Sequence, residues 1–275
     1  MTTQRIDACF KHTRTEKRSA LVAYVMGCDP DFQTSLDIVK GLPKSGVDII
    51  ELGMAFSDPM ADGPAIQAAG KRALTAGASV AKTLQIATEF RNENTHTPII
   101  LMGYYNPVWR YGLQSFVEDA ISAGVDGVIL VDLSPEEESE FVEIASPAGL
   151  SLIKLTAPTT NNDRAQKVFK TASGFVYYIS VAGITGQKSA DIDDIRSNVD
   201  RLRQHTTLPI AVGFGIKTPQ QAADIGSFSD AVVVGSAFVK RIEANIHEPE
   251  NAKNEVLELA EDLSQALRNN TAECA

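Results

Sequence analysis

The sequence predicts an α/β fold, a (β/α)8 barrel, that forms one domain over residues 1–275. Eight short apolar runs alternate with stretches of helical hydrophobic spacing over about 250 residues, which is the pattern of such a barrel. Segments that enter strands echo one another: Gly46-Val47-Asp48 matches Gly124-Val125-Asp126, and Thr97-Pro98-Ile99 matches Leu208-Pro209-Ile210. An open doubly wound sheet is the alternative, but no G-x-G-x-x-G motif follows the first strand.

The expected strands are apolar runs bounded by glycine, proline or polar residues. They cover residues 20–26, 47–53, 98–102, 125–131, 150–155, 174–180, 208–212 and 231–234. Residues 103–107 are expected to form a loop.

The helical pattern predicts more helices than a minimal barrel needs. An extra helix over residues 2–16 precedes the first strand, and helical spacing follows that strand at Leu36, Val39 and Leu42. Two helices are expected after the second strand, between Ile66 and Phe90, and two after the eighth. Further helical signals are a stretch over 116–123 and an acid-rich helix start at 135–138, favourable at the positive end of the helix dipole.

Composition argues against several classes of function. A net charge of −10 argues against nucleic acid as the main partner, because a phosphate backbone needs a basic surface, although one small anion needs only a local site. No apolar run approaches the roughly 18 residues that span a membrane, and the first residues lack a signal-peptide core, which favours a cytoplasmic location. Cys9, Cys28 and Cys274 are far apart and the histidines are scattered, so neither a disulfide framework nor a metal site is expected.

One expected strand contains a charged residue in an otherwise apolar row. Glu51 shares the alternating face of Val47 and Ile49, and a buried carboxylate is costly unless the protein uses it. The loop that follows has turn signals at Asp58-Pro59 and Asp62-Gly63, which bring Asp58 and Asp62 back over the strand end. An ion pair would explain Glu51 and turn or cap chemistry would explain Asp62. Because active sites of these barrels lie at the carboxyl ends of the strands, the location favours two catalytic carboxylates.

Glycine-rich segments follow the last three strands. They are Gly183-Ile184-Thr185-Gly186, Gly213-Phe214-Gly215 and Gly235-Ser236, the last at a helix start. Glycine lets backbone N–H groups approach an anion, and the helix N-terminus adds the positive end of its dipole. A tight turn would explain any one segment, but three at consecutive strand ends indicate a phosphate site.

Apolar and aromatic residues near strand ends suggest what else the ligand contains. Tyr177 has the inward parity of the sixth strand if Ile179 also points inward. The other residues of this kind are Tyr24, Tyr104, Ile129, Leu155 and Phe214. Most such residues are plain core, but beside an anion site and two acids they suggest a substrate with a flat apolar body and a phosphate tail.

The motifs resemble, in order, those of the tryptophan synthase alpha subunit family. They are Glu51-Leu52-Gly53, Phe56-Ser57-Asp58-Pro59, Ala61-Asp62-Gly63-Pro64, Tyr105-Asn106-Pro107, Ala157-Pro158-Thr159-Thr160 and the three glycine segments. The resemblance implies a TIM barrel that cleaves indole-3-glycerol phosphate to indole and glyceraldehyde 3-phosphate, with no cofactor of its own. It also implies a pyridoxal-phosphate (PLP) beta subunit that receives the indole, in an alpha2beta2 heterotetramer.

The resemblance also implies a role for each matching residue. Glu51 matches the general acid/base, Asp62 the second catalytic carboxylate, Tyr177 an active-site tyrosine and Asp58 a residue of the loop that contacts the partner. Residues that match the phosphate site are Gly186, Gly215, Gly235 and Ser236, with Thr185 in the loop that closes over it; the indole pocket would contain Tyr24, Tyr104, Ile129, Leu155 and Phe214. Cys28 departs from the family pattern, since a glycine is usual there.

Two other functions fit parts of the pattern. One is another phosphate-binding barrel enzyme, such as a sugar-phosphate isomerase or decarboxylase, which leaves the segment from Asp58 to Pro64 unexplained. The other is a barrel without turnover that binds and activates a partner, which would need neither Glu51 nor Asp62.

Overall fold

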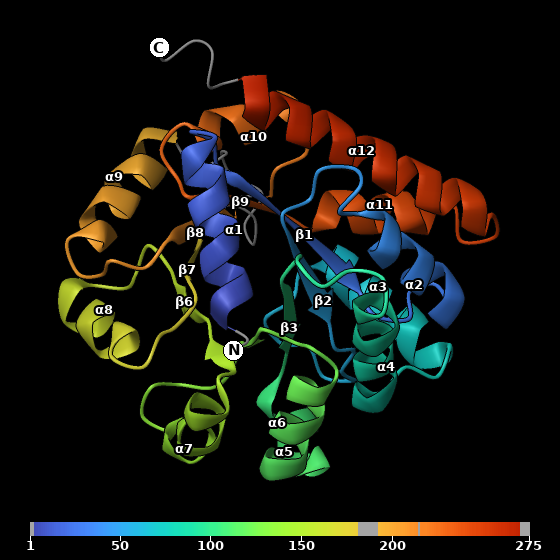
Figure 1. Ribbon diagram of the computed structural model, residues 1–275, viewed down its shortest axis with the longest axis horizontal. Helices are drawn as coiled ribbons and strands as arrows, with labels where there is room; N and C mark the ends of the chain where they lie inside the picture. Colours follow the sequence, from blue (N-terminus) through green and yellow to red (C-terminus); the bar gives the residue numbers. More distant parts are fainter. Residues whose placement is uncertain (1–2, 181–191, 214, 270–275) are drawn as a thin grey trace.

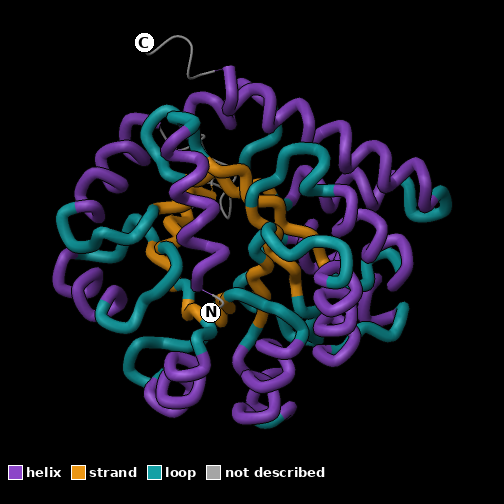
Figure 2. Tube along the Cα trace, in the orientation of Figure 1, coloured by secondary structure: helices purple, strands orange, loops and turns teal. Residues whose placement is uncertain are grey.

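A closed ring of parallel strands forms the centre of the molecule, as seen in a computed structural model that describes residues 3–180, 192–213 and 215–269 (Figures 1 and 2). The strands are β1 (Ala20–Met26), β2 (Ile49–Gly53), β3 (Ile99–Gly103), β4 (Gly127–Leu130), β5 (Ser151–Leu152), β6 (Lys154–Thr156), β7 (Val176–Ile179), β8 (Ile210–Gly213) and β9 (Ala231–Val234). Their order is β5-β4-β3-β2-β1-β9-β8-β7-β6. The two ends of this order, β5 and β6, are halves of one expected strand divided at Ile153, so the prediction of an eight-stranded barrel is confirmed.

Helices surround the ring of strands and include those predicted beyond the minimal barrel (Figure 1). They are α1 (Thr3–Thr15), α2 (Phe32–Gly41), α3 (Pro64–Thr75), α4 (Val80–Arg91), α5 (Tyr105–Tyr111), α6 (Leu113–Ser122), α7 (Ser139–Ala148), α8 (Asn162–Phe169), α9 (Ile192–Arg203), α10 (Pro219–Gly226), α11 (Ser236–Ala244) and α12 (Pro249–Asn269). The N-terminal helix, the pair after β2 and the pair after the last strand all match the prediction.

Two local predictions were wrong. Residues 105–107 belong to α5 and not to a loop, because Pro107 lies in the first turn, where a helix needs no backbone N–H donor. Helix α7 begins at Ser139 and not within 135–138. Glu138 precedes the helix and is buried in an ion pair with Lys154, a contact across the fold that the local charge pattern does not reveal.

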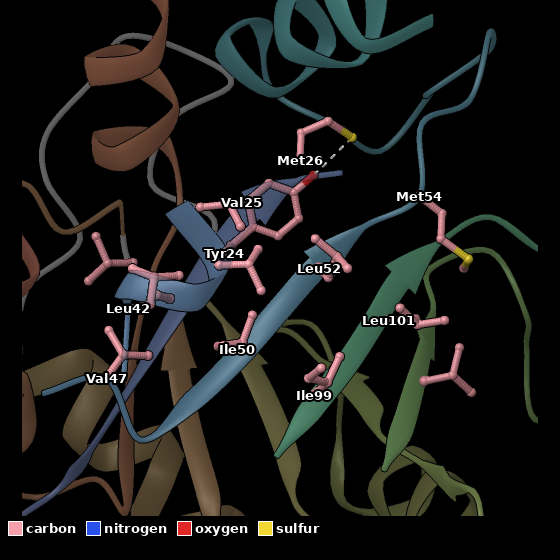
Figure 3. Close-up of a cluster of buried hydrophobic side chains, with 14 of the residues drawn as sticks. Tyr24, Val25, Met26, Leu42, Val47, Ile50, Leu52, Met54, Ile99 and Leu101 are labelled. Carbon is pink, nitrogen blue, oxygen red and sulfur yellow. Dashed lines mark hydrogen bonds between the residues drawn. The ribbon is translucent and has the colours of Figure 1, made fainter. Parts of the chain in front are cut away.

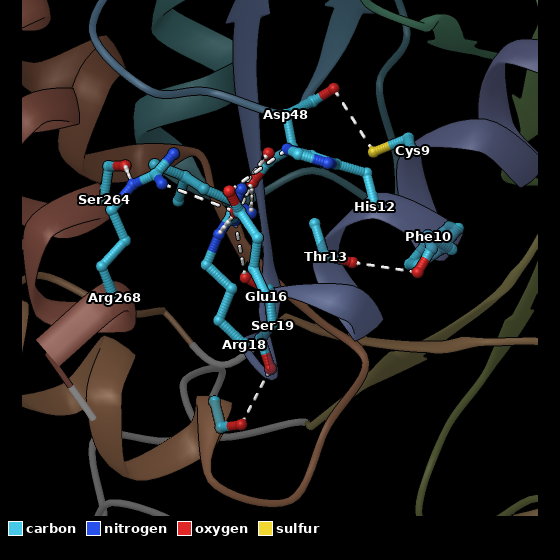
Figure 4. A network of polar contacts seen from close by, with 12 residues as sticks. Cys9, Phe10, His12, Thr13, Glu16, Arg18, Ser19, Asp48, Ser264 and Arg268 are labelled. Carbon is cyan, nitrogen blue, oxygen red and sulfur yellow. Dashed lines mark hydrogen bonds and ion pairs between the residues drawn. The ribbon is translucent and has the colours of Figure 1, made fainter. Parts of the chain in front are cut away.

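The N-terminal helix α1 covers the amino end of the barrel (Figure 1). Its Ile6 and Phe10 join the inner apolar cluster, where the rings of Phe10 and Phe175 have centroids 5.8 Å apart. Just after the helix, the Arg18 guanidinium binds Asp48 at 2.6 and 2.8 Å (Figure 4). Because α1 fills this end, the carboxyl ends of the strands are left for a site.

Alternation along the strands separates an inner from an outer apolar layer. The inner layer contains Val22, Ile49, Ile100, Ile129, Ile153, Phe175, Ala211 and Ala231. Glu51 lies two residues after Ile49 on β2, so the predicted face that it shares with Ile49 is the inner one. Val47 does not share it: β2 begins only at Ile49, and Val47 lies in the outer cluster with Leu42 and Ile50 (Figure 3).

Candidate active site

A cavity of about 200 Å³ lies at the carboxyl ends of the strands and is lined by seven of the fourteen predicted site residues. Its described lining consists of Tyr24, Glu51, Asp62, Ile66, Met102, Tyr177, Ile179, Ser180, Gly213, Gly215, Val233, Gly235 and Ser236. The fold therefore brings both acids, the inward tyrosines and parts of two glycine segments to one place.

Glu51 reaches the cavity from the end of β2 and is almost completely buried. It stands beside Tyr24 in the register of β1 and β2, and 1 % of its surface is exposed. Its Oε2 atom has no hydrogen-bond partner, and no ion pair forms on it among the described residues. Burial, helped by the negative charge of Asp62, raises the pKa of Glu51 to about 8. The ion-pair explanation suggested by the local sequence therefore has no support in the described part of the chain.

Asp62 reaches the same cavity from the loop between β2 and α3. Gly63 is the N-cap of α3 with Pro64 at the helix start, and no side chain caps this helix, so the Asp62 carboxylate does not serve as a cap. Burial raises the pKa of Asp62 to about 6, while a hydrogen bond from Tyr104 opposes the rise. The two carboxyl groups thus have pKa values on either side of 7, a separation that suits one acid and one anion.

Glycines at the ends of β8 and β9 form another part of the cavity wall. Gly235 is the N-cap of α11, which begins at Ser236 without a side-chain cap, so backbone N–H groups at this helix end are available to an anion. Gly215 has φ +66°, a left-handed conformation that favours glycine. A Cβ atom on Gly213 would lie 2.6 Å from the Tyr177 hydroxyl, so only glycine allows this close approach.

The remaining predicted residues occupy different environments. Tyr24 lines the cavity, whereas Tyr104 is buried beside the loop that carries Asp62. Ile129 belongs to the inner barrel core, and Leu155 lines a separate cavity of about 250 Å³ near Lys154. Asp58 is exposed on its loop and is not part of the described cavity lining, so of the two loop acids Asp62 alone reaches the site. Thr185, Gly186 and Phe214 lie outside the described residues.

Sequence reasoning missed several lining residues. Met102, Ile179 and Val233 lie near or at the carboxyl ends of their strands, and strict alternation would have placed Met102 inward, two residues after Ile100. Ser180 is 7 % exposed, and its hydroxyl has no hydrogen-bond partner. No local signal in the sequence distinguishes this serine from any other.

Other chemistry is not evident in the part of the chain that the structure describes. Within residues 3–180, 192–213 and 215–269, no group of three or more His, Cys, Asp or Glu residues could hold a metal ion. Cys9 and Cys28 are free thiols, and Cys28 has φ +66°, a left-handed conformation in which a glycine would be unstrained. No described helix is long and apolar enough to cross a membrane.

Comparisons with known proteins agree with the geometry. The sequence model of the tryptophan synthase alpha chain family matches residues 10–268. The crystal structure of the alpha subunit from Legionella pneumophila str. Paris is similar at a TM-score of 0.90 and 36 % identity, covering 96 % of this chain and 98 % of that one. A tryptophan synthase structure from M. tuberculosis, in an open form with BRD0059 bound, is similar at a TM-score of 0.84 and 31 % identity, covering 96 % and 98 %.

Proposed function

The chain belongs to the tryptophan synthase alpha chain family, and on this premise we propose that it cleaves indole-3-glycerol phosphate to indole and glyceraldehyde 3-phosphate. The observation that carries the proposal is the pair of acids in one cavity. With a pKa of about 8 Glu51 is protonated at neutral pH, and with a pKa of about 6 Asp62 is ionised. A retro-aldol cleavage of an indole needs one group in each state.

The proton of Glu51 would start the reaction. Transferred to C3 of the indole ring, it makes the ring an electron acceptor, with positive charge on the ring nitrogen. The Asp62 carboxylate would accept a hydrogen bond from that N–H and stabilise the charge as it develops. The two jobs require a neutral and an ionised carboxyl group respectively, in agreement with their environments.

Cleavage of the carbon–carbon bond would follow. The Glu51 carboxylate, now deprotonated, removes the proton from the hydroxyl on the chain carbon attached to C3. That carbon becomes the aldehyde of glyceraldehyde 3-phosphate, and the electrons of the broken bond return to the ring to give indole. Each well-placed proton transfer contributes on the order of 10²- to 10⁴-fold to the rate, and the balance requires no metal or organic cofactor.

The glycine wall would hold the phosphate. N–H groups around Gly235 and Ser236 lie at the positive end of α11, and Gly215 leaves space beside them. Tyr177 and Tyr24 would contact the body of the substrate between this wall and the acids. Thr185, Gly186 and Phe214 have proposed roles by resemblance alone.

We infer also that the chain works with a PLP-dependent beta subunit, which takes the indole. The loop from Phe56 to Asp62 supports this inference, because Asp58 is exposed and Met60 is 79 % exposed on the segment that leads directly to the catalytic Asp62. A partner on this loop could therefore affect the position of Asp62.

The test is indole release from indole-3-glycerol phosphate by the purified chain, alone and with a tryptophan synthase beta subunit. We expect slow release that rises sharply with the partner. The Glu51→Gln variant prepared in the same way controls for contaminating enzymes. No release in either arm, from a folded protein that binds glycerol 3-phosphate, would point to another phosphate-binding barrel enzyme.

A further inference from the structure

We propose that Tyr104 is a positioning residue for Asp62: the Tyr104 hydroxyl holds the loop that carries this acid and orients its carboxylate. The inference rests on the proposed function and assigns Tyr104 a role other than a wall of the indole pocket. Its basis is the set of contacts that Tyr104 makes, since the residue is 2 % exposed and does not belong to the described lining of the cavity.

The Tyr104 hydroxyl interacts with two consecutive residues of the loop, Ala61 and Asp62. The backbone N–H of Ala61 donates to the hydroxyl oxygen at 2.9 Å. The Asp62 carboxylate lies within reach of the same hydroxyl, and a hydrogen bond between the two side chains lowers the pKa of Asp62. A hydroxyl has one proton to donate, and because Tyr104 accepts from Ala61, this proton is available to the acid.

Tyr104 also holds the other end of the loop. Its ring lies against Phe56, with ring centroids 5.3 Å apart. Tyr104 itself is fixed in place, because it follows β3 and is the N-cap residue of α5. Tyr104 therefore contacts the loop at Phe56, at Ala61 and at Asp62 from one rigid position in the barrel.

The loop has few other attachments in the described part of the chain. Between Phe56 and Asp62, the hydrogen bonds to residues outside the loop involve Tyr104 and the Gln67 side chain, which is exposed on α3 and donates to the backbone carbonyls of Pro59 and Asp62. Gln67 thus holds the backbone but not the Asp62 carboxylate. Among the described residues, Tyr104 is the one whose hydrogen bond acts on the carboxylate itself.

The charges around Asp62 give the hydroxyl a second effect. The titratable groups that interact with Asp62 are Glu51 from β2, Tyr24 from β1 and Tyr104. Burial favours the protonated form of Asp62, and the Tyr104 hydrogen bond favours the ionised form that the reaction needs. Loss of the hydroxyl should both loosen the carboxylate and make it harder to ionise.

Tyr104→Phe tests the proposal, because it keeps the ring on Phe56 and removes the hydroxyl alone. Asp62 must be ionised to act, so activity is lost as pH falls through its pKa. In the variant we expect the acid limb of the kcat/KM profile for indole-3-glycerol phosphate to move up by about one pH unit, a tenfold change in ionisation at a given pH. The alkaline limb, which depends on Glu51, should stay in place. A purely structural role would lower activity equally at all pH values.

Tyr111→Phe is the matched control, since Tyr111 also donates its hydroxyl to a carboxylate, that of Asp119, at 2.6 Å on the protein surface. A carbon-13 NMR titration of Asp62 gives a second readout that does not need turnover, and it should show the pKa higher in Tyr104→Phe than in wild type. An unshifted acid limb together with an unshifted Asp62 titration would overturn the inference. Absence of turnover in the wild-type protein would instead contradict the proposed function, and the NMR titration would still decide the role of Tyr104.

Discussion

Replacement of Glu51 by glutamine should make the protein more stable while it removes most turnover. Glutamine has nearly the same shape as a protonated glutamate but has no proton to lose. In the native protein burial raises the pKa of Glu51 to about 8, against an ordinary value of 4.5. Between these two pH values the native state holds a proton that the unfolded chain has released, so wild-type stability should fall as pH rises.

The expected gain follows from this interval. At about 1.4 kcal/mol per pKa unit, the interval from pH 4.5 to pH 7 corresponds to about 3 kcal/mol of unfolding free energy. Glu51→Gln removes this cost, so the variant should match wild type near pH 4.5 and exceed it by about 3 kcal/mol at pH 7. At each pH in this range the variant should form indole on the order of 10²- to 10⁴-fold more slowly than wild type.

Urea unfolding followed by far-UV circular dichroism at pH 5, 6, 7 and 8 measures the stability difference, and an indole assay measures turnover. Glu258→Gln on the exposed face of α12 is the matched control, and its stability should follow wild type at every pH. The reasoning fails if Glu51→Gln and wild type lose stability in parallel from pH 5 to pH 8, or if the variant retains normal activity.

Three further substitutions test other parts of the structure. Gly213→Ala should lower the free energy of unfolding by about 1–3 kcal/mol and weaken glycerol 3-phosphate binding, because the new Cβ would push Tyr177 into the cavity. Thermal melting measures the first effect and calorimetry the second. An unchanged protein would contradict the close packing of Gly213 and Tyr177. Lys17→Gly should stabilise the protein by about 0.5–1 kcal/mol in urea unfolding, because Lys17, just after α1, has φ +56°, a left-handed conformation that favours glycine. A loss of stability would count against backbone strain at this residue. Asp126→Ala should lower the free energy of unfolding by about 3–5 kcal/mol in the same assay, because Arg5 of α1 and Arg91 of α4 both lose their fully buried carboxylate partner. A loss below 1 kcal/mol would show that α1 is held in another way.

Much of the architecture could be predicted because it depends on local pattern. Apolar runs marked the strands, and β1 and β9 have the predicted bounds of 20–26 and 231–234. Glu51 was recognised because a carboxylate in an apolar row is chemically anomalous wherever the strand lies. Local pattern failed where a distant contact sets the structure, as at Glu138, whose ion pair with Lys154 places it before α7 and not inside a helix.

Local pattern was thus enough for the alternation of strands and helices, for the place of the two acids at the carboxyl ends of the strands, and for Gly215, Gly235 and Ser236 beside them. Local pattern does not say which inward residues reach the cavity: Met102 lines it, while Ile129, its partner in the strand register, is buried in the core. The tertiary structure decided this, and also that Tyr104 bonds to the loop of Asp62. The physical reason is that alternation along a strand is set by its own backbone, whereas depth in the barrel and side-chain partners depend on how strands and loops far apart in the chain are brought together.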